Sequence, residues 1–80
     1  MQLELFYHDE CGFSRQVLNT IKNLKIGEKI VLKHIIKDPD FEDELVALCG
    51  NAQVPTLKVD GKPMRESEVI NRFLVEQFVD

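Results

Sequence analysis

The change from a strand pattern to a helical pattern around residue 11 is the feature that most constrains the fold. Residues 2–7 alternate polar and apolar side chains and end on two aromatic residues, as a β-strand does. Four apolar residues then recur at helical spacing, and we expect them to share one helix face: Phe13, Val17, Ile21 and Leu24. Cys11 is therefore predicted to lie at or just before the first turn of that helix.

This position predicts a reactive thiol. The first turn of a helix presents unpaired N–H groups and a partial positive charge, which lower a cysteine pKa from about 8.5 to between roughly 3.5 and 7.5. The charges of Asp9 and Glu10 oppose ionisation, whereas His8 would favour it when protonated or would carry a proton. Gly12 leaves room for another molecule to approach the sulfur. We expect a lowered pKa; the alternative is that Cys11 is a small apolar residue in a loop.

Composition and charge exclude several classes of partner. The 80 residues are 44% hydrophobic and 30% charged, which is typical of one small globular domain spanning residues 1–80. The net charge of −4 and the scattered Lys and Arg residues argue against nucleic-acid binding. No apolar run approaches the roughly 20 residues that cross a bilayer, and the N-terminus lacks the pattern of a signal peptide. We therefore expect a cytoplasmic protein with no membrane partner.

Residues 25–36 complete a β-α-β unit. Residues 25–29 break the helical period, and Gly27 is expected to be the helix C-cap. Residues 30–36 are rich in β-branched side chains and almost continuously apolar, which predicts a strand covered on both faces. Because a helix joins the two strands, they should run parallel with a right-handed crossover.

A second, short helix is predicted from Asp38 onward. Asp38 is a suitable N-cap, Pro39 suits the first helical position, and residues 50–51 should end the helix. Cys49 falls in its last turn and is expected to be a buried structural thiol. The two cysteines are too few for a disulfide scaffold and lack metal-ligand spacing. Three apolar residues should form the buried side of the helix: Phe41, Leu45 and Leu48.

The last third of the chain predicts a hairpin followed by a helix. Residues 56–59 and 62–65 form the strands around the turn residues Asp60–Gly61, and Pro63 places the second strand at an edge of the sheet. Ser67 is expected to cap the last helix. Five of that helix's apolar residues should face inward: Val69, Ile70, Phe73, Leu74 and Phe78. The order β-α-β-α-β-β-α predicts an α/β fold, a four-stranded mixed sheet flanked by helices.

Four features in this order and spacing resemble the glutaredoxins of the thioredoxin-like superfamily, over essentially the whole domain. They are Cys11-Gly12-Phe13-Ser14 after the first strand, Val54-Pro55 before the third strand, the Asp60-Gly61 turn, and Glu66-Ser67 at the last helix. The Cys-Gly-Phe-Ser tetrapeptide is that of the monothiol glutaredoxins. Residues 64–70 look more like the N-terminal domains of glutathione transferases; no transferase helical domain follows within the 80 residues, so we do not expect a transferase proper.

The resemblance implies a glutathione site. It implies a cis bond between Val54 and Pro55 beside the sulfur, with the main chain of Val54 pairing with the cysteinyl unit of glutathione like a short strand. It also implies that Glu66 and Ser67 bind the γ-glutamyl end, and a helix N-terminus does favour a carboxylate. Alternatively, Ser67 is only a cap and Glu66 only a solvated carboxylate. Gln53, together with Lys37, is a weaker candidate for the glycyl carboxylate.

The leading functional hypothesis is a glutathione-dependent thiol–disulfide oxidoreductase that works by a monothiol route in redox homeostasis. Cys11 would be the nucleophile, Ser14 would hydrogen-bond the sulfur, and His8 would protonate the leaving thiol. Phe13 would form a wall beside the sulfur. The alternatives are a spectator hydroxyl at Ser14, an exposed histidine at His8 and a core aromatic residue at Phe13.

The sequence is compatible with two other functions. Monothiol glutaredoxins carry a 2Fe-2S cluster between two protomers, which here would use Cys11 and glutathione. The chain departs from that pattern, with His8 in place of a lysine, no Trp, and Arg65–Glu66 in place of a Gly-Gly pair. A non-catalytic glutathione- or protein-binding module is the third possibility. The expected partners are glutathione and glutathionylated proteins or small disulfides, and the expected state is a monomer unless a cluster bridges a dimer.

Overall fold

The computed structural model describes residues 1–79 and has the predicted element order. The strands are β1 (Leu3–Tyr7), β2 (Ile30–His34), β3 (Thr56–Val59) and β4 (Lys62–Arg65). The helices are α1 (Gly12–Leu24), α2 (Pro39–Cys49) and α3 (Ser67–Phe78), with a short 3₁₀ helix, η1 (Gly27–Lys29), before β2. Within residues 1–79, none of the helices combines the length and the apolar character that crossing a membrane requires.

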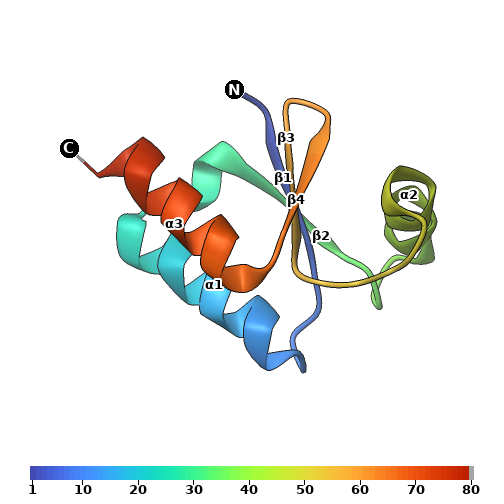
Figure 1. Cartoon of the computed structure of the whole chain (residues 1–80). Coiled ribbons are helices and arrows are strands. Elements are labelled where there is room, and N and C mark those ends of the chain that lie inside the picture. Colours follow the sequence, from blue (N-terminus) through green and yellow to red (C-terminus); the bar gives the residue numbers. More distant parts are fainter. Residues whose placement is uncertain (80) are drawn as a thin grey trace.

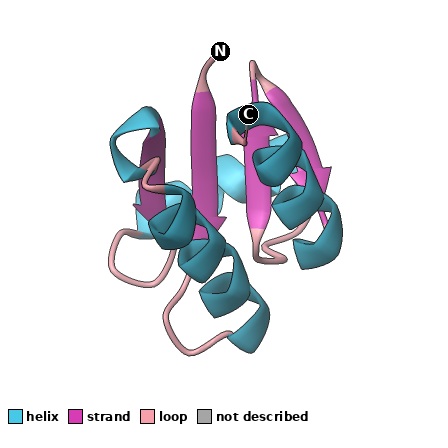
Figure 2. Cartoon of the chain, turned by 90° about the vertical axis from the view of Figure 1, so that its left-hand side faces the viewer, coloured by secondary structure: helices cyan, strands magenta, loops and turns pink. Residues whose placement is uncertain are grey.

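The four strands form one mixed sheet in the order β2-β1-β3-β4. β1 pairs parallel with β2 and antiparallel with β3, and β3 pairs antiparallel with β4. α1 and α3 lie side by side on one face of the sheet, and α2 covers the other face (Figures 1 and 2). The predicted α/β fold with a four-stranded mixed sheet flanked by helices is confirmed.

The core has two parts, one on each face of the sheet. On the α1–α3 side, Leu3 and Leu5 of β1 belong to a large cluster of buried apolar residues that includes Val17 of α1 and Ile70 of α3. On the α2 side, Phe6 packs with Ile35 and Leu45. Full burial of each such side chain stabilises the fold by roughly 1.5–3 kcal/mol. Because successive side chains of β1 point to opposite faces of the sheet, this one strand contributes to both parts of the core.

Local turn and cap chemistry was predicted correctly at several places. The Asp38 carboxylate accepts a hydrogen bond from the N–H of Asp40 at 3.0 Å, and Pro39 follows at the first helical position. Gly50 ends α2 in the left-handed conformation with φ 84°. Asp60 and Gly61, with φ of 49° and 88°, make the hairpin turn.

Three expectations about individual elements were wrong. β2 is not covered on both faces, because it is an edge strand that ends at His34; Val31 is 56% exposed. Gly27 does not cap α1, because Lys25 adopts the left-handed conformation with φ 57° and its N–H bonds back to the last turn, so that Gly27 begins η1. Val69 does not face inward; it is 42% exposed.

Four charged side chains tie α2 to the sheet. Lys33 Nζ lies 2.6 Å from Glu4 Oε1 and 2.8 Å from Glu44 Oε1, and Lys58 Nζ lies 3.3 Å from Glu44 Oε2 and 3.5 Å from Glu4 Oε2. The Lys33 ammonium also lies over the ring of Phe6, 5.3 Å from its centre. These partners are far apart in the sequence, so no local pattern predicts their contacts. The hydrogen bond from Lys33 outweighs partial burial and lowers the pKa of Glu44.

Glu44→Gln is expected to lower the free energy of unfolding by about 1 kcal/mol near neutral pH, a value reduced because the carboxylate is partly exposed. The folded pKa of Glu44 lies below its unfolded value, so this contribution is present above the unfolded pKa and is lost as the pH falls through the folded pKa. Urea unfolding of both proteins at neutral and at acidic pH measures the difference. Glu42→Gln, an exposed position on the same helix, is the matched control. A difference that persists in acid would contradict this account.

Candidate functional site

Cys11 lies where the chain leaves the central strand and enters α1. It is the N-cap residue of α1, with φ −85° and ψ 119°, and its thiol is partly exposed. Its backbone N–H donates to the carbonyl oxygen of His8 at 3.4 Å, which closes the turn after β1. Its Sγ lies 3.9 Å from the carbonyl oxygen of Val54. The sulfur therefore emerges at the first turn of a helix and faces the segment before β3.

The surroundings of Cys11 favour the thiolate. Partial burial raises the pKa of the thiol, but the backbone N–H and hydroxyl of Ser14, the N–H of Phe13 and the charge of Arg15 together lower it below its ordinary value. The first turn of α1 contains no acidic residue. The direction of the shift was predicted from the helix N-terminus, whereas the contribution of Arg15 was missed.

Ser14 is placed to respond to ionisation of the sulfur. Its hydroxyl is fully buried and has no hydrogen-bond partner among the described residues. A neutral thiol is a weak acceptor and a thiolate is a strong one. Ionisation of Cys11 therefore supplies the acceptor that this hydroxyl lacks, which is how Ser14 lowers the thiol pKa.

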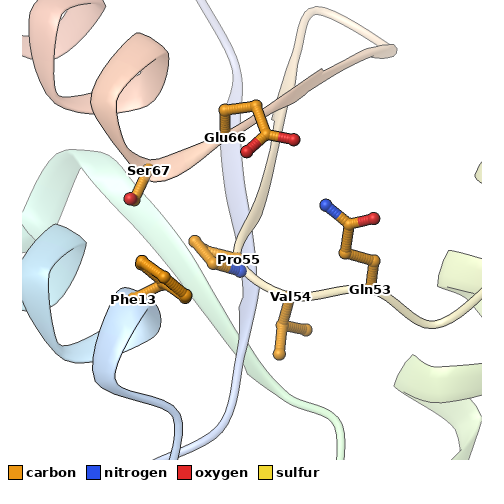
Figure 3. A pocket seen from close by; sticks show the side chains of 6 residues that line it. All are labelled: Phe13, Gln53, Val54, Pro55, Glu66 and Ser67. Atoms are coloured by element: carbon orange, nitrogen blue, oxygen red, sulfur yellow. The ribbon is translucent and has the colours of Figure 1, made fainter.

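A groove of about 260 Å³ opens beside the sulfur-facing segment (Figure 3). Three structural units line it: α1, the segment before β3, and the junction of β4 with α3. The polar ends of Glu66 and Gln53 point toward the same open space, while the Val54 side chain points away from it. The Val54–Pro55 peptide bond is cis. Six residues expected to bind glutathione are brought together here: Phe13, Gln53, Val54, Pro55, Glu66 and Ser67.

The junction of β4 with α3 differs from the prediction. Glu66, not Ser67, is the N-cap residue of α3, and its φ of 74° is unusual for a residue with a side chain. Ser67 is the first helical residue; its buried hydroxyl donates to Gln16 Oε1 of α1 at 3.3 Å instead of capping its own helix. The N-terminus of α3 therefore lies at the groove, and the hydroxyl of its first residue, Ser67, is hydrogen-bonded to α1.

Phe13 is not a core residue. It is 62% exposed and forms one wall of the groove, below Ser67 in Figure 3. The alternative of a core residue is therefore wrong, as is the expectation that Phe13 shares the buried face of α1, because the first turn lies at the groove; a wall beside the sulfur itself stays a prediction. That face is left to Val17 and Ile21, with Leu24 partly buried.

Two predicted residues lie outside the groove. His8 and Lys37 line a separate hollow of about 480 Å³, together with His34. His8 Nδ1 accepts from the N–H of Glu10 at 3.1 Å, and no hydrogen bond joins its ring to the Cys11 sulfur in the described part of the chain. His34, for which no role was predicted, pairs with Asp9 at 3.1 Å and thereby ties the loop after β1 to β2.

Cys49 is partly buried and packs against the Phe6–Ile35–Leu45 cluster, as does Val54. Its location supports the structural interpretation. Among residues 1–79, no group of three or more His, Cys, Asp or Glu side chains could hold a metal ion. The described residues therefore do not fit a resident metal centre within one chain.

The pH dependence of Cys11 alkylation tests these electrostatics. In a Cys49→Ser background, the midpoint for reaction with iodoacetamide should lie below the ordinary pKa of a cysteine thiol. Ser14→Ala and Arg15→Gln should each raise the midpoint, because each removes a group that stabilises the thiolate. Lys22→Gln, in the last turn of the same helix, should leave it unchanged. A wild-type midpoint at or above the ordinary value would refute the account.

Comparisons with known proteins agree on one family. Residues 10–77 match the model "Glutathione S-transferase, N-terminal domain". The chain is 32% identical over 69 residues to "Glutathione S-transferase DHAR2" of Arabidopsis thaliana, covering 86% of this chain and 31% of that protein, so it spans about a third of the relative's length. Among solved structures, glutathione S-transferase 1-6 from Anopheles dirus species B is 27% identical with a TM-score of 0.77, over 96% of this chain and 36% of that one. Glutathione transferase E6 from Drosophila melanogaster is 26% identical with a TM-score of 0.73, over 99% and 36%. The chain therefore belongs to the family of glutathione S-transferase N-terminal domains, which have the thioredoxin-like fold.

Proposed function

We propose that this domain binds glutathione in the groove and uses Cys11 as the nucleophile of glutathione-dependent thiol–disulfide exchange. The observation that carries the proposal is the position of Cys11: a partly exposed thiol with a lowered pKa at the N-cap of α1, 3.9 Å from the carbonyl oxygen of Val54 in the groove wall. A nucleophilic thiol needs a thiolate form and access for its partner; the lowered pKa of Cys11 increases the thiolate fraction, and its partial exposure gives access.

The proposed cycle needs one protein thiol. The Cys11 thiolate attacks the glutathione sulfur of a mixed disulfide; the bond between Cys11 and glutathione forms, and the target leaves as a thiolate that takes up a proton. A second glutathione thiolate then attacks the bound glutathione sulfur, which releases oxidised glutathione and regenerates the Cys11 thiolate. Each turn thus consumes one free glutathione: its sulfur and the glutathione sulfur of the mixed disulfide form the S–S bond of oxidised glutathione, and the target is released as a thiol. Ser14 stabilises the thiolate at the start and end of the cycle, whereas His8 lies outside the groove and is assigned no step.

The groove offers matching groups for each part of glutathione. The main chain of Val54 would pair with the cysteinyl unit in the manner of a short added strand. The N-terminus of α3 at Ser67 suits the α-carboxylate of the γ-glutamyl unit, and the Glu66 carboxylate suits its ammonium group. The Gln53 amide lies on the opposite wall, where it would reach the glycyl end.

A transferase reaction is the second candidate, and the family match favours it. In that reaction the thiolate of glutathione itself would attack an electrophile, and Cys11 would not form a covalent intermediate. The two proposals share the groove and differ in whether the Cys11 sulfur is required. A variant that lacks this sulfur therefore separates them.

Cys11→Ser is expected to lower the glutathione-coupled reduction of hydroxyethyl disulfide by about a thousandfold or more, because a hydroxyl at this position is a poor nucleophile toward sulfur. Cys49→Ser is the matched control, and it should keep at least about half of the activity, since Cys49 packs away from the groove opening. If Cys11→Ser retains full turnover, the exchange mechanism is wrong. If it loses reduction but conjugates glutathione to an aromatic electrophile, the transferase candidate is supported instead.

Glu66→Gln is expected to raise the dissociation constant for reduced glutathione about tenfold, because the amide keeps the shape but loses the charge that faces the γ-glutamyl ammonium. Titration calorimetry under reducing conditions measures the change. Glu76→Gln, an exposed carboxylate near the other end of α3, is the control for the loss of one negative charge. Equal affinities of Glu66→Gln and the wild type would show that Glu66 is only a solvated surface residue.

A further inference from the structure

Arg65 connects the two walls of the groove. It is partly buried at the end of β4, directly before Glu66, and it lies opposite Thr56 of β3 in the sheet register. Its Nε donates to Thr56 Oγ1 at 3.1 Å, and its Nη2 donates to the carbonyl oxygen of Asn51 at 3.3 Å. One guanidinium group therefore bonds to both ends of the segment 51–56.

The Thr56 hydroxyl extends this connection to the groove wall. It is fully buried, accepts from Arg65 and donates to the carbonyl oxygen of Gln53 at 2.8 Å. The N–H of Gln53 donates to Asn51 Oδ1 at 3.1 Å. The segment that carries Gln53, Val54 and Pro55 is thus held by a continuous set of hydrogen bonds, and Arg65 is its link to β4.

The second wall begins at the residue after Arg65. Glu66 has a φ of 74°, a conformation that costs free energy for a residue with a side chain and persists where neighbouring contacts determine it. Arg65 directly precedes Glu66 in the chain, and its side chain is hydrogen-bonded to two acceptors, Thr56 Oγ1 and the carbonyl oxygen of Asn51. Because a guanidinium is a rigid planar fork, its two acceptors take up one geometry relative to each other, and the Arg65 side chain ties both of them to the end of β4.

We propose that Arg65 is a positioning residue that sets the separation of the two groove walls, and thereby the affinity of the groove for a γ-glutamyl tripeptide thiol. The affinity part of this inference rests on the proposed function, whereas the fixing of the walls does not. Arg65 is absent from the groups that shift the pKa of Cys11, so its loss should leave the intrinsic reactivity of the thiol unchanged. Long-range attraction between its charge and the glutathione carboxylates is the competing explanation, and it would survive replacement by lysine.

The test compares Arg65→Ala and Arg65→Lys with Arg72→Ala, the control for loss of an exposed arginine that makes no hydrogen bond or ion pair within residues 1–79. Three quantities are measured: the dissociation constant for reduced glutathione, amide hydrogen exchange of residues 51–56 and 66–67, and the pH midpoint for alkylation of Cys11 by iodoacetamide. Arg65→Ala should weaken glutathione binding about tenfold, because part of the binding free energy would then be spent on ordering the two walls.

Arg65→Lys keeps the charge but lacks the two-pronged geometry, so it should still weaken binding about threefold. Both Arg65 variants should exchange faster in the two wall segments, with the Cys11 midpoint unchanged. Arg72→Ala should match the wild type in all three measurements.

Three results would overturn the inference. The first is wild-type affinity and exchange in Arg65→Ala. The second is weakened binding in Arg65→Ala together with wild-type affinity in Arg65→Lys, which would show that only the positive charge of residue 65 matters for glutathione binding. The third is faster exchange throughout the molecule together with a shifted Cys11 midpoint, which would identify a general structural role. If the wild type binds no glutathione, the proposed function fails, and hydrogen exchange in the two segments decides the role of Arg65 by itself.

Discussion

Burial of both faces of β1 is the constraint on which the rest of the structure depends. β1 is hydrogen-bonded on both sides, and it places Leu3 and Leu5 against α1 and α3 while Phe6 packs toward α2. Because successive side chains point to opposite faces, a shift of one residue would exchange the two sets, so only one register fills both layers. That register fixes where the chain leaves the sheet. Cys11 follows after a short loop, so the position of the sulfur is a consequence of core packing.

Much of the fold was predictable because its signals are local. Asp38–Pro39 starts a helix and Asp60–Gly61 makes a hairpin turn through properties of those residues alone. The errors occur where tertiary contacts decide. An apolar sequence predicted that residues 30–36 are covered on both faces, but strand order makes β2 an edge. Likewise, Lys25 takes the left-handed conformation although Gly27 is the better residue for it, because the last-turn carbonyl oxygens are within reach of the Lys25 N–H.

In the candidate site, too, local features were predictable from the sequence and contacts between distant segments were not. The resemblance to a known family named the residues of the groove wall, and the N-terminus of a helix predicted the direction of the Cys11 shift. Contacts between distant segments carried no sequence signal. The bonds from Arg65 to Asn51 and Thr56 depend on the register of β3 with β4, and the Lys33 network depends on the packing of α2. Such partners can be recognised only after the sheet has been assembled.

The electrostatics of the groove are set by this assembly and not by the net charge. The chain carries a net charge of −4, yet α1 and α3 both begin beside the groove, and a helix N-terminus carries unpaired N–H groups and a partial positive charge. Arg15 adds positive charge near the sulfur, while Glu4 and Glu44 are paired with lysines on the α2 side of the sheet. The groups that stabilise the Cys11 thiolate thus lie at the start of α1, whereas the charged residue that lines the groove, Glu66, is negative. The lowered pKa of the thiol is thus a result of the fold, because the exit from β1 places Cys11 at the N-terminus of α1, where main-chain N–H groups and Arg15 stabilise the thiolate.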